Sequence, residues 1–254
     1  MKKYTSMPKG FIIIILLGLQ IVAHAQLADL DVLLEKKEQF VAQKEQSILM
    51  LKKRLAANPN ASLESRFQIV NNLYNEYRSF IYDSAFAYAK RLIDLGYEIN
   101  DPEKIGYAKT QMGFTTLSAG MFKETFDTLN TVKVSQLDDS TKLEYYSLMA
   151  RALYDISDFN RDAFYSDNYV VMADKYIEFA TSMSEPDSYT FLYLKGLHNL
   201  RVERTDESVR YLNKLMDKKE RLTNHEFAIT ASTLSYLHLK LGDTTKAINL
   251  LAEA

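Results

Sequence analysis

The chain of 254 residues contains no cysteine and no tryptophan, and it has only four prolines and eight glycines. The lack of cysteine excludes a disulfide framework, a thiolate metal site and a cysteine nucleophile. It also excludes a lipoprotein anchor, which needs a cysteine directly after the leader. Since proline and glycine interrupt regular structure, their scarcity favours long helices over many short strands.

No excess of positive charge is present either. Charged residues make up 25% of the chain and apolar residues 47%, which is typical of a folded globular protein. The formal net charge is −2. A nucleic-acid-binding domain normally shows a basic face. We therefore expect no nucleic-acid partner for this segment.

Residues 1–25 have the pattern of a signal peptide. The apolar stretch Phe11 to Val22 leads to a small-x-small site that predicts cleavage between Ala25 and Gln26. The positive front consists of Lys2, Lys3 and Lys9. Without these lysines, 28 basic and 33 acidic residues remain, a net charge of −5. The apolar stretch is shorter than the ~20 residues of a spanning helix, but an uncleaved anchor over Pro8 to Ala25 remains an alternative. No later stretch approaches that length.

Leu27 to Leu55 predicts one long helix, so residues 26–57 form an N-terminal segment that Asn58-Pro59-Asn60 ends. Its heptad stripe consists of Leu27, Leu34, Val41, Ile48 and Leu55, with companions at Leu30, Lys37, Lys44 and Leu51. The stripe is apolar at both ends and charged in the middle, an imperfect coiled-coil pattern. Self-association through residues 27–55 and capping of a repeat stack both fit it.

From residue 63 onward a spacing recurs around four small residues. These origins are Ala85, Thr125, Ser208 and Ala247, separated by 40, 83 and 39 residues. Four residues later stand Ala89, Leu129, Leu212 and Leu251; seven later stand Leu92, Val132, Leu215 and Ala254; twelve earlier stand Leu73, Gly113, Gly196 and Ser235. Small residues at fixed places let paired helices approach closely. The 83-residue interval predicts a further pair between Leu143 and Ala180, with a long joint from Asp155 to Asp167.

Helix starts are marked by capping patterns. Asp101-Pro102-Glu103 supplies a cap, a first-turn proline and an acid that suits the helix dipole. Ser184 to Asp187 repeats that order, and Thr141 to Glu144 and Thr223 to Glu226 each predict a capping box.

The repeat resembles the tetratricopeptide repeat. The closest copy has Leu234-Ser235-Tyr236, Leu241-Gly242-Asp243 and Lys246-Ala247-Ile248. The second has Met112-Gly113-Phe114, Ala119-Gly120-Met121 and Glu124-Thr125-Phe126. The period near 40 exceeds the usual ~34, so longer helices or loops are expected. We predict an all-α fold: an α-solenoid of about five tetratricopeptide-like pairs over residues 63–254, the last one truncated, preceded by the long N-terminal helix.

Three longer stretches resemble the front half of a Gram-negative family of membrane-bound regulators. They are Leu30 to Leu51, Asn72 to Arg91 and Ser118 to Leu129. Members of that family carry a leader, a periplasmic tetratricopeptide sensor, a transmembrane helix, a coiled coil and a helix-turn-helix DNA-binding end. The resemblance implies a periplasmic location, with a membrane contact only through a missing downstream segment or an uncleaved leader.

The search for catalytic chemistry finds no constellation. His198, His225 and His238 are not spaced to place two ligands on one helix face. Asp158 to Asp162 matches the first ligand positions of a calcium loop, but Ala163 stands where the turn glycine is required. We therefore expect no enzyme, no metal site and no cofactor.

The inner groove of the solenoid is the candidate site. The first helix of each pair is expected to present the side chains Asn71, Tyr74, Arg78, Gln111, Phe114, Tyr193, Arg201, Tyr236 and Lys240. Aromatic rings with amides and cations suit a protein or peptide ligand. The alternative is that many of the tyrosines are buried repeat core. Only Asn71 and Arg78 resemble the carboxylate clamp of tetratricopeptide domains.

Two functions follow from these patterns. The first is a non-catalytic, ligand-sensing part of a membrane-bound transcriptional regulator, in which binding favours one curvature of the solenoid. The alternative is a free periplasmic scaffold that assembles cell-envelope proteins. An apolar run of ~20 residues beyond residue 254 would favour the regulator.

Overall fold

The computed structural model describes residues 36–254, and its regular structure there is helical, without a strand. Residues 36–57 are helical. The helices that follow are α2 (Leu63–Tyr77), α3 (Tyr82–Ile99), α4 (Pro102–Ser118), α5 (Phe122–Leu129), α6 (Asp139–Asn160), α7 (Ser166–Ser182), α8 (Tyr189–Arg201), α9 (Thr205–Met216), α10 (Asn224–Lys240) and α11 (Thr244–Glu253), with short 3-10 turns at Val134–Gln136 and Lys219–Arg221. The prediction of an all-α fold is confirmed.

The chain divides into two compact units, Met1–Ser47 and Ile48–Ala254. Of the first unit the structure describes residues 36–47, which are helical. The expected signal peptide, its Ala25–Gln26 cleavage site and the start of the heptad stripe lie outside the described residues. Within residues 36–254 no helix combines the length and the hydrophobicity that crossing a bilayer requires.

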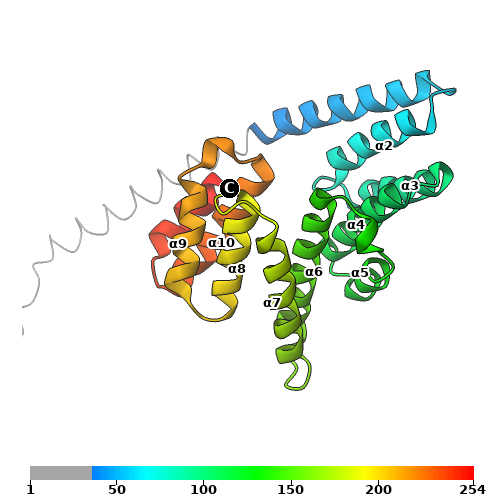
Figure 1. The fold of residues 1–254 in the computed structure, drawn as a ribbon. Helices are drawn as coiled ribbons and strands as arrows, with labels where there is room; N and C mark the ends of the chain where they lie inside the picture. Colours follow the sequence, from blue (N-terminus) through cyan, green and yellow to red (C-terminus); the bar gives the residue numbers. More distant parts are fainter. Residues whose placement is uncertain (1–35) are drawn as a thin grey trace, which may run out of the picture. The chain divides into compact units, whose positions relative to one another are not determined.

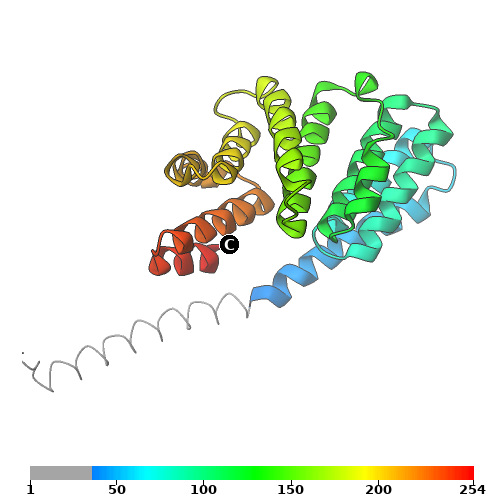
Figure 2. The same cartoon turned by 90° about the horizontal axis from the view of Figure 1, so that it is seen from below.

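The second unit is built from successive helix pairs. α2 packs with α3, α4 with α5, α6 with α7, α8 with α9 and α10 with α11. Contacts of α3 with α4, α4 with α6, α7 with α8 and α9 with α10 join each pair to the next. Figures 1 and 2 show these neighbours in two views. The arrangement is the predicted solenoid of helix pairs.

The four small origins of the repeat are all fully buried, namely Ala85, Thr125, Ser208 and Ala247. In two helix pairs the residue twelve positions before the origin contacts the residue four positions after it. A Cβ atom built on Gly113 would lie 2.5 Å from Leu129, and one on Gly196 would lie 2.7 Å from Leu212. The close helix approach predicted from small residues is therefore confirmed in both pairs. Leu251 departs from the pattern because it is exposed.

Two of the predicted helix starts have the expected geometry. The Asp101 carboxylate accepts hydrogen bonds from the backbone N–H groups of Glu103 and Lys104, at 2.9 and 3.2 Å. Thr223 and Glu226 form a reciprocal capping box before α10. In both places a side-chain oxygen satisfies backbone donors that the first turn leaves without a helical partner.

The other two starts were placed wrongly. α8 is capped by Ser188, whose hydroxyl accepts from the Phe191 N–H, and not by Ser184. α6 is capped by Asp138, whose carboxylate accepts from the Thr141 N–H at 2.7 Å. In each case a second capping residue lies within four positions of the expected one. The Ser184 hydroxyl instead donates to the Ala180 carbonyl at the end of α7, at 2.7 Å.

The third pair is longer and its joint shorter than predicted. α6 continues to Asn160, where Arg161 ends it in the left-handed conformation. Only residues 161–165 separate it from α7. The first six residues of the predicted joint from Asp155 to Asp167 are therefore part of α6, where Tyr154 and Ser157 are buried.

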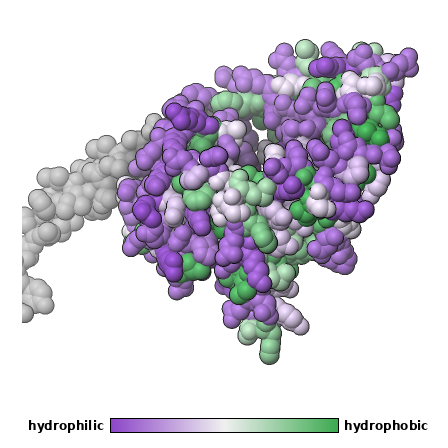
Figure 3. Space-filling model, in the orientation of Figure 1, coloured by the Kyte–Doolittle hydropathy of each residue, from purple (hydrophilic) through white to green (hydrophobic). Residues whose placement is uncertain are grey.

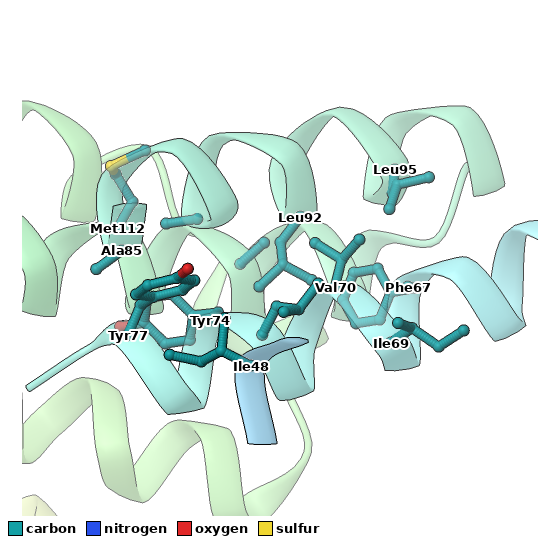
Figure 4. Packing of buried hydrophobic residues seen from close by; sticks show 13 residues of the cluster. Ile48, Phe67, Ile69, Val70, Tyr74, Tyr77, Ala85, Leu92, Leu95 and Met112 are labelled. Carbon is teal, nitrogen blue, oxygen red and sulfur yellow. The ribbon is translucent and has the colours of Figure 1, made fainter. Parts of the chain in front are cut away.

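The hydrophobic core begins at the end of the N-terminal helix. Ile48 is buried in a cluster with α2 and α3, and Leu51 and Leu55 pack against that cluster. Figure 4 shows Ile48 beside Tyr74 and Tyr77 of α2. From Ile48 onward the heptad stripe therefore packs on the first helix pair. This is the arrangement expected if the N-terminal helix caps the repeat stack.

Candidate functional site

The expected groove residues lie on α2, α4, α8 and α10, the first helices of their pairs, or at the end of one of them. They fall into two groups. Asn71, Tyr74, Arg78, Gln111 and Phe114 belong to the first and second pairs. Arg201, Tyr236 and Lys240 line one pocket, and Tyr193 lies close to it.

Arg78 and Phe114 form the centre of the first group. The Arg78 guanidinium lies 4.2 Å from the centre of the Phe114 ring, and that of Arg151 on α6 lies 5.9 Å from it. The Arg78 Nη2 also lies 4.0 Å from the Glu144 carboxylate. Both guanidiniums are partly exposed, so two cations and one aromatic face are present on this surface.

Tyr74 and Gln111 do not face the groove. Tyr74 has an exposed fraction of 0%, and its hydroxyl donates to the Gln111 carbonyl at 3.0 Å. Burial raises the pKa of Tyr74 to about 12. Gln111 is also buried, and its Nε2 donates to Glu144 at 2.8 Å. Both side chains join α2, α4 and α6, and neither is exposed to solvent in this structure. They belong to the buried core that was the alternative.

Asn71 is half-buried and already has a partner. The Tyr107 hydroxyl donates to its Oδ1 at 2.8 Å. Burial raises the pKa of Tyr107, so this phenol keeps its proton and remains a donor near neutral pH. The amide N–H groups of Asn71 make no bond with the described residues. They remain the part of this side chain that a ligand carbonyl can use.

His225, which was not among the predicted site residues, lies beside the first group. Its ring and that of Phe114 meet edge to face, with centroids 6.4 Å apart. Burial lowers the pKa of His225, and the positive charges of Arg78 and Arg151 lower it further. The sequence places His225 in the first turn of α10, but nothing in its spacing indicates contact with α4.

The second group surrounds a pocket of about 510 Å³. Its lining combines Arg201 and Lys240 with the ring of Tyr236, the apolar Leu197, and the hydroxyls of Ser232 and Thr233. Asp158, Val170, Leu200 and Glu203 complete it. Within residues 36–254 the Tyr236 side chain is 57% exposed. Lys240 forms no ion pair with any residue from 36 to 254.

Arg201 is held in place from two sides. Its guanidinium forms an ion pair with Asp158 and lies 5.3 Å from the centre of the Tyr154 ring. Its Nε is buried and makes no hydrogen bond among the described residues. The Tyr154 hydroxyl donates to Asp174 at 2.5 Å, and burial raises the pKa of Tyr154. His198 Nδ1 lies 2.9 Å from the same carboxylate oxygen. This network fixes α6, α7 and α8 around Arg201.

Tyr193 is less available than predicted. It is half-buried, its ring stacks on Tyr189 at 5.4 Å, and burial raises its pKa. It therefore supports the pocket rather than lining it. Of the predicted site residues in this pocket, Tyr236 and Lys240 are the exposed ones.

The pocket combines an exposed aromatic ring, a lysine without an ion-pair partner among residues 36–254, two hydroxyl-bearing residues, two acidic residues and an apolar wall. Residues 36–254 contain no cluster of three or more His, Cys, Asp or Glu side chains that could hold a metal ion. Such a mixed lining suits a ligand with both apolar and hydrogen-bonding groups.

Comparison with known proteins agrees with the fold. The family described as the SusR N-terminal TPR domain matches residues 34–254. Among solved structures, a thermophilic TPR protein of Thermus thermophilus is similar with a TM-score of 0.57 and 18% sequence identity. The similarity covers 76% of this chain and 90% of the other. No curated protein matches the sequence.

Proposed function

Because the chain belongs to the family of SusR N-terminal TPR domains, we propose that it is the ligand-sensing part of a regulator and binds a protein or peptide in its inner pocket. Tetratricopeptide repeats are helical scaffolds whose stacked pairs create extended binding surfaces. The observation that carries the proposal is the pocket of Arg201, Tyr236 and Lys240. An extended peptide meets there an aromatic platform, a cation and hydroxyl groups.

The way in which binding produces a signal follows from how the pocket is built. Its lining comes from α6, α7, α8 and α10, which belong to three successive helix pairs. A ligand that contacts all three pairs favours the relative arrangement in which those contacts are best. It thereby shifts the population of solenoid conformations. In a regulator that shift is passed to the following segments.

The cellular setting is part of the same proposal. The leader sequence at residues 1–25 and the resemblance to membrane-bound regulators support an exported, periplasmic domain attached to a cytoplasmic DNA-binding half. A free periplasmic scaffold has the same pocket and the same leader. Expression of a reporter gene under control of the full-length protein separates the two. A regulator changes reporter output when its pocket is mutated, whereas a scaffold leaves the output unchanged.

Binding is tested with a phage-displayed library of unstructured peptides. We expect the protein to select a set of related peptides and the double variant Tyr236→Ala, Lys240→Ala to bind them at least tenfold more weakly. Truncating an aromatic hot spot costs ~2 kcal/mol or more of binding. Tyr97→Ala is the matched control, because Tyr97 is also 57% exposed but lies on α3.

The melting temperature must be recorded with each variant. Truncating exposed side chains changes stability by only ~0.5 kcal/mol. A double variant that melts normally and still binds every selected peptide excludes the pocket as the site. Equal weakening by Tyr97→Ala contradicts it as well, because the loss would then not be specific to this surface.

A further inference from the structure

Helix α7 carries a regular apolar stripe on its exposed side. We call this the α7 stripe; its residues are Tyr165, Tyr169, Met172, Tyr176, Phe179 and Met183, separated alternately by four and three positions. Tyr165 and Met183 flank α7 in right-handed helical geometry, so they continue its surface. Four of the six are exposed, and Tyr169 and Tyr176 are half-buried at its edge. Figure 3 shows hydrophobic side chains on the α6–α7 hairpin, in the lower part of the view.

The stripe faces away from the inner pocket. Ala173 and Ile177 of α7 are buried in the core, and Val170 lines the pocket. Val170 and Phe179 are nine positions apart, which at ~100° per residue places them on opposite sides of the helix. The α7 stripe is thus a second surface, separate from the site proposed above.

The stripe is a preformed surface. The Phe179 ring lies 5.3 Å from Tyr146 of α6 and 6.5 Å from Tyr176. Tyr146 also contacts Tyr176, at 6.1 Å between ring centroids. These contacts hold the aromatic side chains in place, so little side-chain entropy remains to be lost when the surface is covered.

The alternating spacing of four and three indicates what covers it. This is the spacing at which one helix presents a continuous seam to another. Lys175 borders the seam, is exposed, and forms no ion pair with the described residues. We propose that the α7 stripe binds an amphipathic helix of a partner protein, which has its own apolar residues at the same spacing and an acidic side chain opposite Lys175.

A second copy of this chain fits the surface less well. The stripe extends over ~27 Å, or about two and a half heptads, for any helix that covers it, so charge and not length distinguishes the partners. Antiparallel pairing of two α7 helices brings the two Lys175 ammonium groups together. Like charges at an interface disfavour that partner. An acidic residue on a different helix has the complementary charge.

The test uses a fluorescently labelled helical peptide with leucines at the six seam positions and one glutamate opposite Lys175. Its binding to the full chain is measured by fluorescence anisotropy. A peptide of equal composition with the leucines spread around the helix is the first control. We expect the seam peptide to bind at least tenfold more tightly, and Phe179→Glu to weaken it at least tenfold. Leu251→Glu is the matched control, because Leu251 and Phe179 are both 53% exposed.

Charge reversal gives a second, milder variant that keeps the fold. Lys175→Glu should weaken the glutamate peptide and strengthen a peptide with lysine in its place. Equal binding of the two leucine arrangements, or unchanged binding by Phe179→Glu, overturns the proposal. So does dimerisation of the chain in sedimentation, or binding to phosphatidylcholine vesicles, if Phe179→Glu abolishes it. Pocket variants at Tyr236 and Lys240 leave the stripe intact, so the two proposals fail independently.

Discussion

The ring of His225 on α10 lies edge-on to the ring of Phe114 on α4, with 6.4 Å between their centroids. These helices belong to the second and fifth pairs, and the two residues are 111 positions apart along the chain. Arg78 of the first pair and Arg151 of the third also lie against Phe114. Side chains from the first, third and fifth helix pairs thus surround one aromatic ring of the second pair.

This environment predicts an unusually acidic imidazolium. We expect the pKa of His225 to lie below its ordinary value of 6.5, because burial and the charges of Arg78 and Arg151 disfavour the protonated form. Titration of the His225 ring by NMR measures this pKa. Arg151→Gln should raise it, whereas Arg210→Gln, which changes an exposed cation of α9, should leave it unchanged. A His225 pKa above 6.5 would show that the ring is solvated and remote from both arginines.

The same shift predicts a pH dependence of stability. The unfolded chain binds the His225 proton more tightly than the folded chain does. The free energy of unfolding therefore falls as the pH decreases below ~6.5 and levels off below the folded-state pKa. His225→Gln removes this contribution. Thermal melts of both proteins between pH 8 and pH 5 should diverge in that direction, and parallel curves contradict the assignment.

Tyr74 is expected to behave as a core residue. Tyr74→Ala should lower the free energy of unfolding by ~3–5 kcal/mol, because it leaves a cavity between α2 and α4. Tyr74→Phe removes only the hydroxyl, with its bonds to the Gln111 carbonyl and the Thr115 hydroxyl, which costs ~1–2 kcal/mol. Urea unfolding measures both values. If the Tyr74→Ala protein is as stable as the wild type, Tyr74 is not a core residue, and the prediction that it lines the groove stands.

Gly113 should not tolerate a methyl group. An alanine Cβ at this position meets Leu129, which is itself fully buried, so overpacking costs ~1–3 kcal/mol. This exceeds the gain in helix propensity of ~1 kcal/mol. A double-mutant cycle with Leu129→Ala checks the cause, because the two losses should sum to more than the loss of the double variant. Ser118→Ala, an exposed change on α4, serves as control.

The end of the N-terminal helix is expected to stabilise the repeats. Ile48→Ala should cost ~2–5 kcal/mol, because the Ile48 side chain is buried against the first helix pair. Its neighbour Leu49 is exposed, so Leu49→Ala should change stability by only ~0.5 kcal/mol. If Ile48→Ala instead leaves stability unchanged and alters only the sedimentation of the protein, the heptad stripe of residues 27–55 serves self-association.

The leader is tested by the mature N-terminus. We expect periplasmic protein to begin at Gln26, since the small residues Ala23 and Ala25 precede it in the pattern of a cleavage site. N-terminal sequencing of the exported chain measures this directly. Recovery of intact Met1 in a membrane fraction would support the uncleaved anchor.

Local chemistry explains why much of the helix-pair fold could be predicted. The caps at Asp101 and Thr223 satisfy backbone donors within a few residues, so their geometry depends on neighbours in the sequence. Apolar residues follow the origins Ala85 and Ser208 at four and seven positions, which is helical spacing and marks one contact face. Two serines compete to cap α8, and the choice of Ser188 was predicted wrongly because Ser184 bonds to the end of α7 instead.

The exposure of the site residues could not be predicted from their positions in the repeat. Tyr74, Phe114, Leu197 and Tyr236 all stand eleven positions before a small origin, yet Tyr74 is fully buried and Tyr236 is mostly exposed. The Tyr74 hydroxyl is covered by α4, while no further helix pair among residues 36–254 covers Tyr236 of α10. A repeat position specifies a helix face, but the helix that packs on that face comes from another part of the chain.

The sequence by itself therefore determined the all-α class, the helix pairs and the small residues at which they meet, because these depend on contacts that recur at fixed spacing. Only the tertiary structure decided that Gln111 is core, that His225 reaches Phe114, and that Arg201 and Lys240 share one pocket. Those relationships join side chains from different pairs. Their separations are set by how the pairs stack, which no periodicity along the chain records.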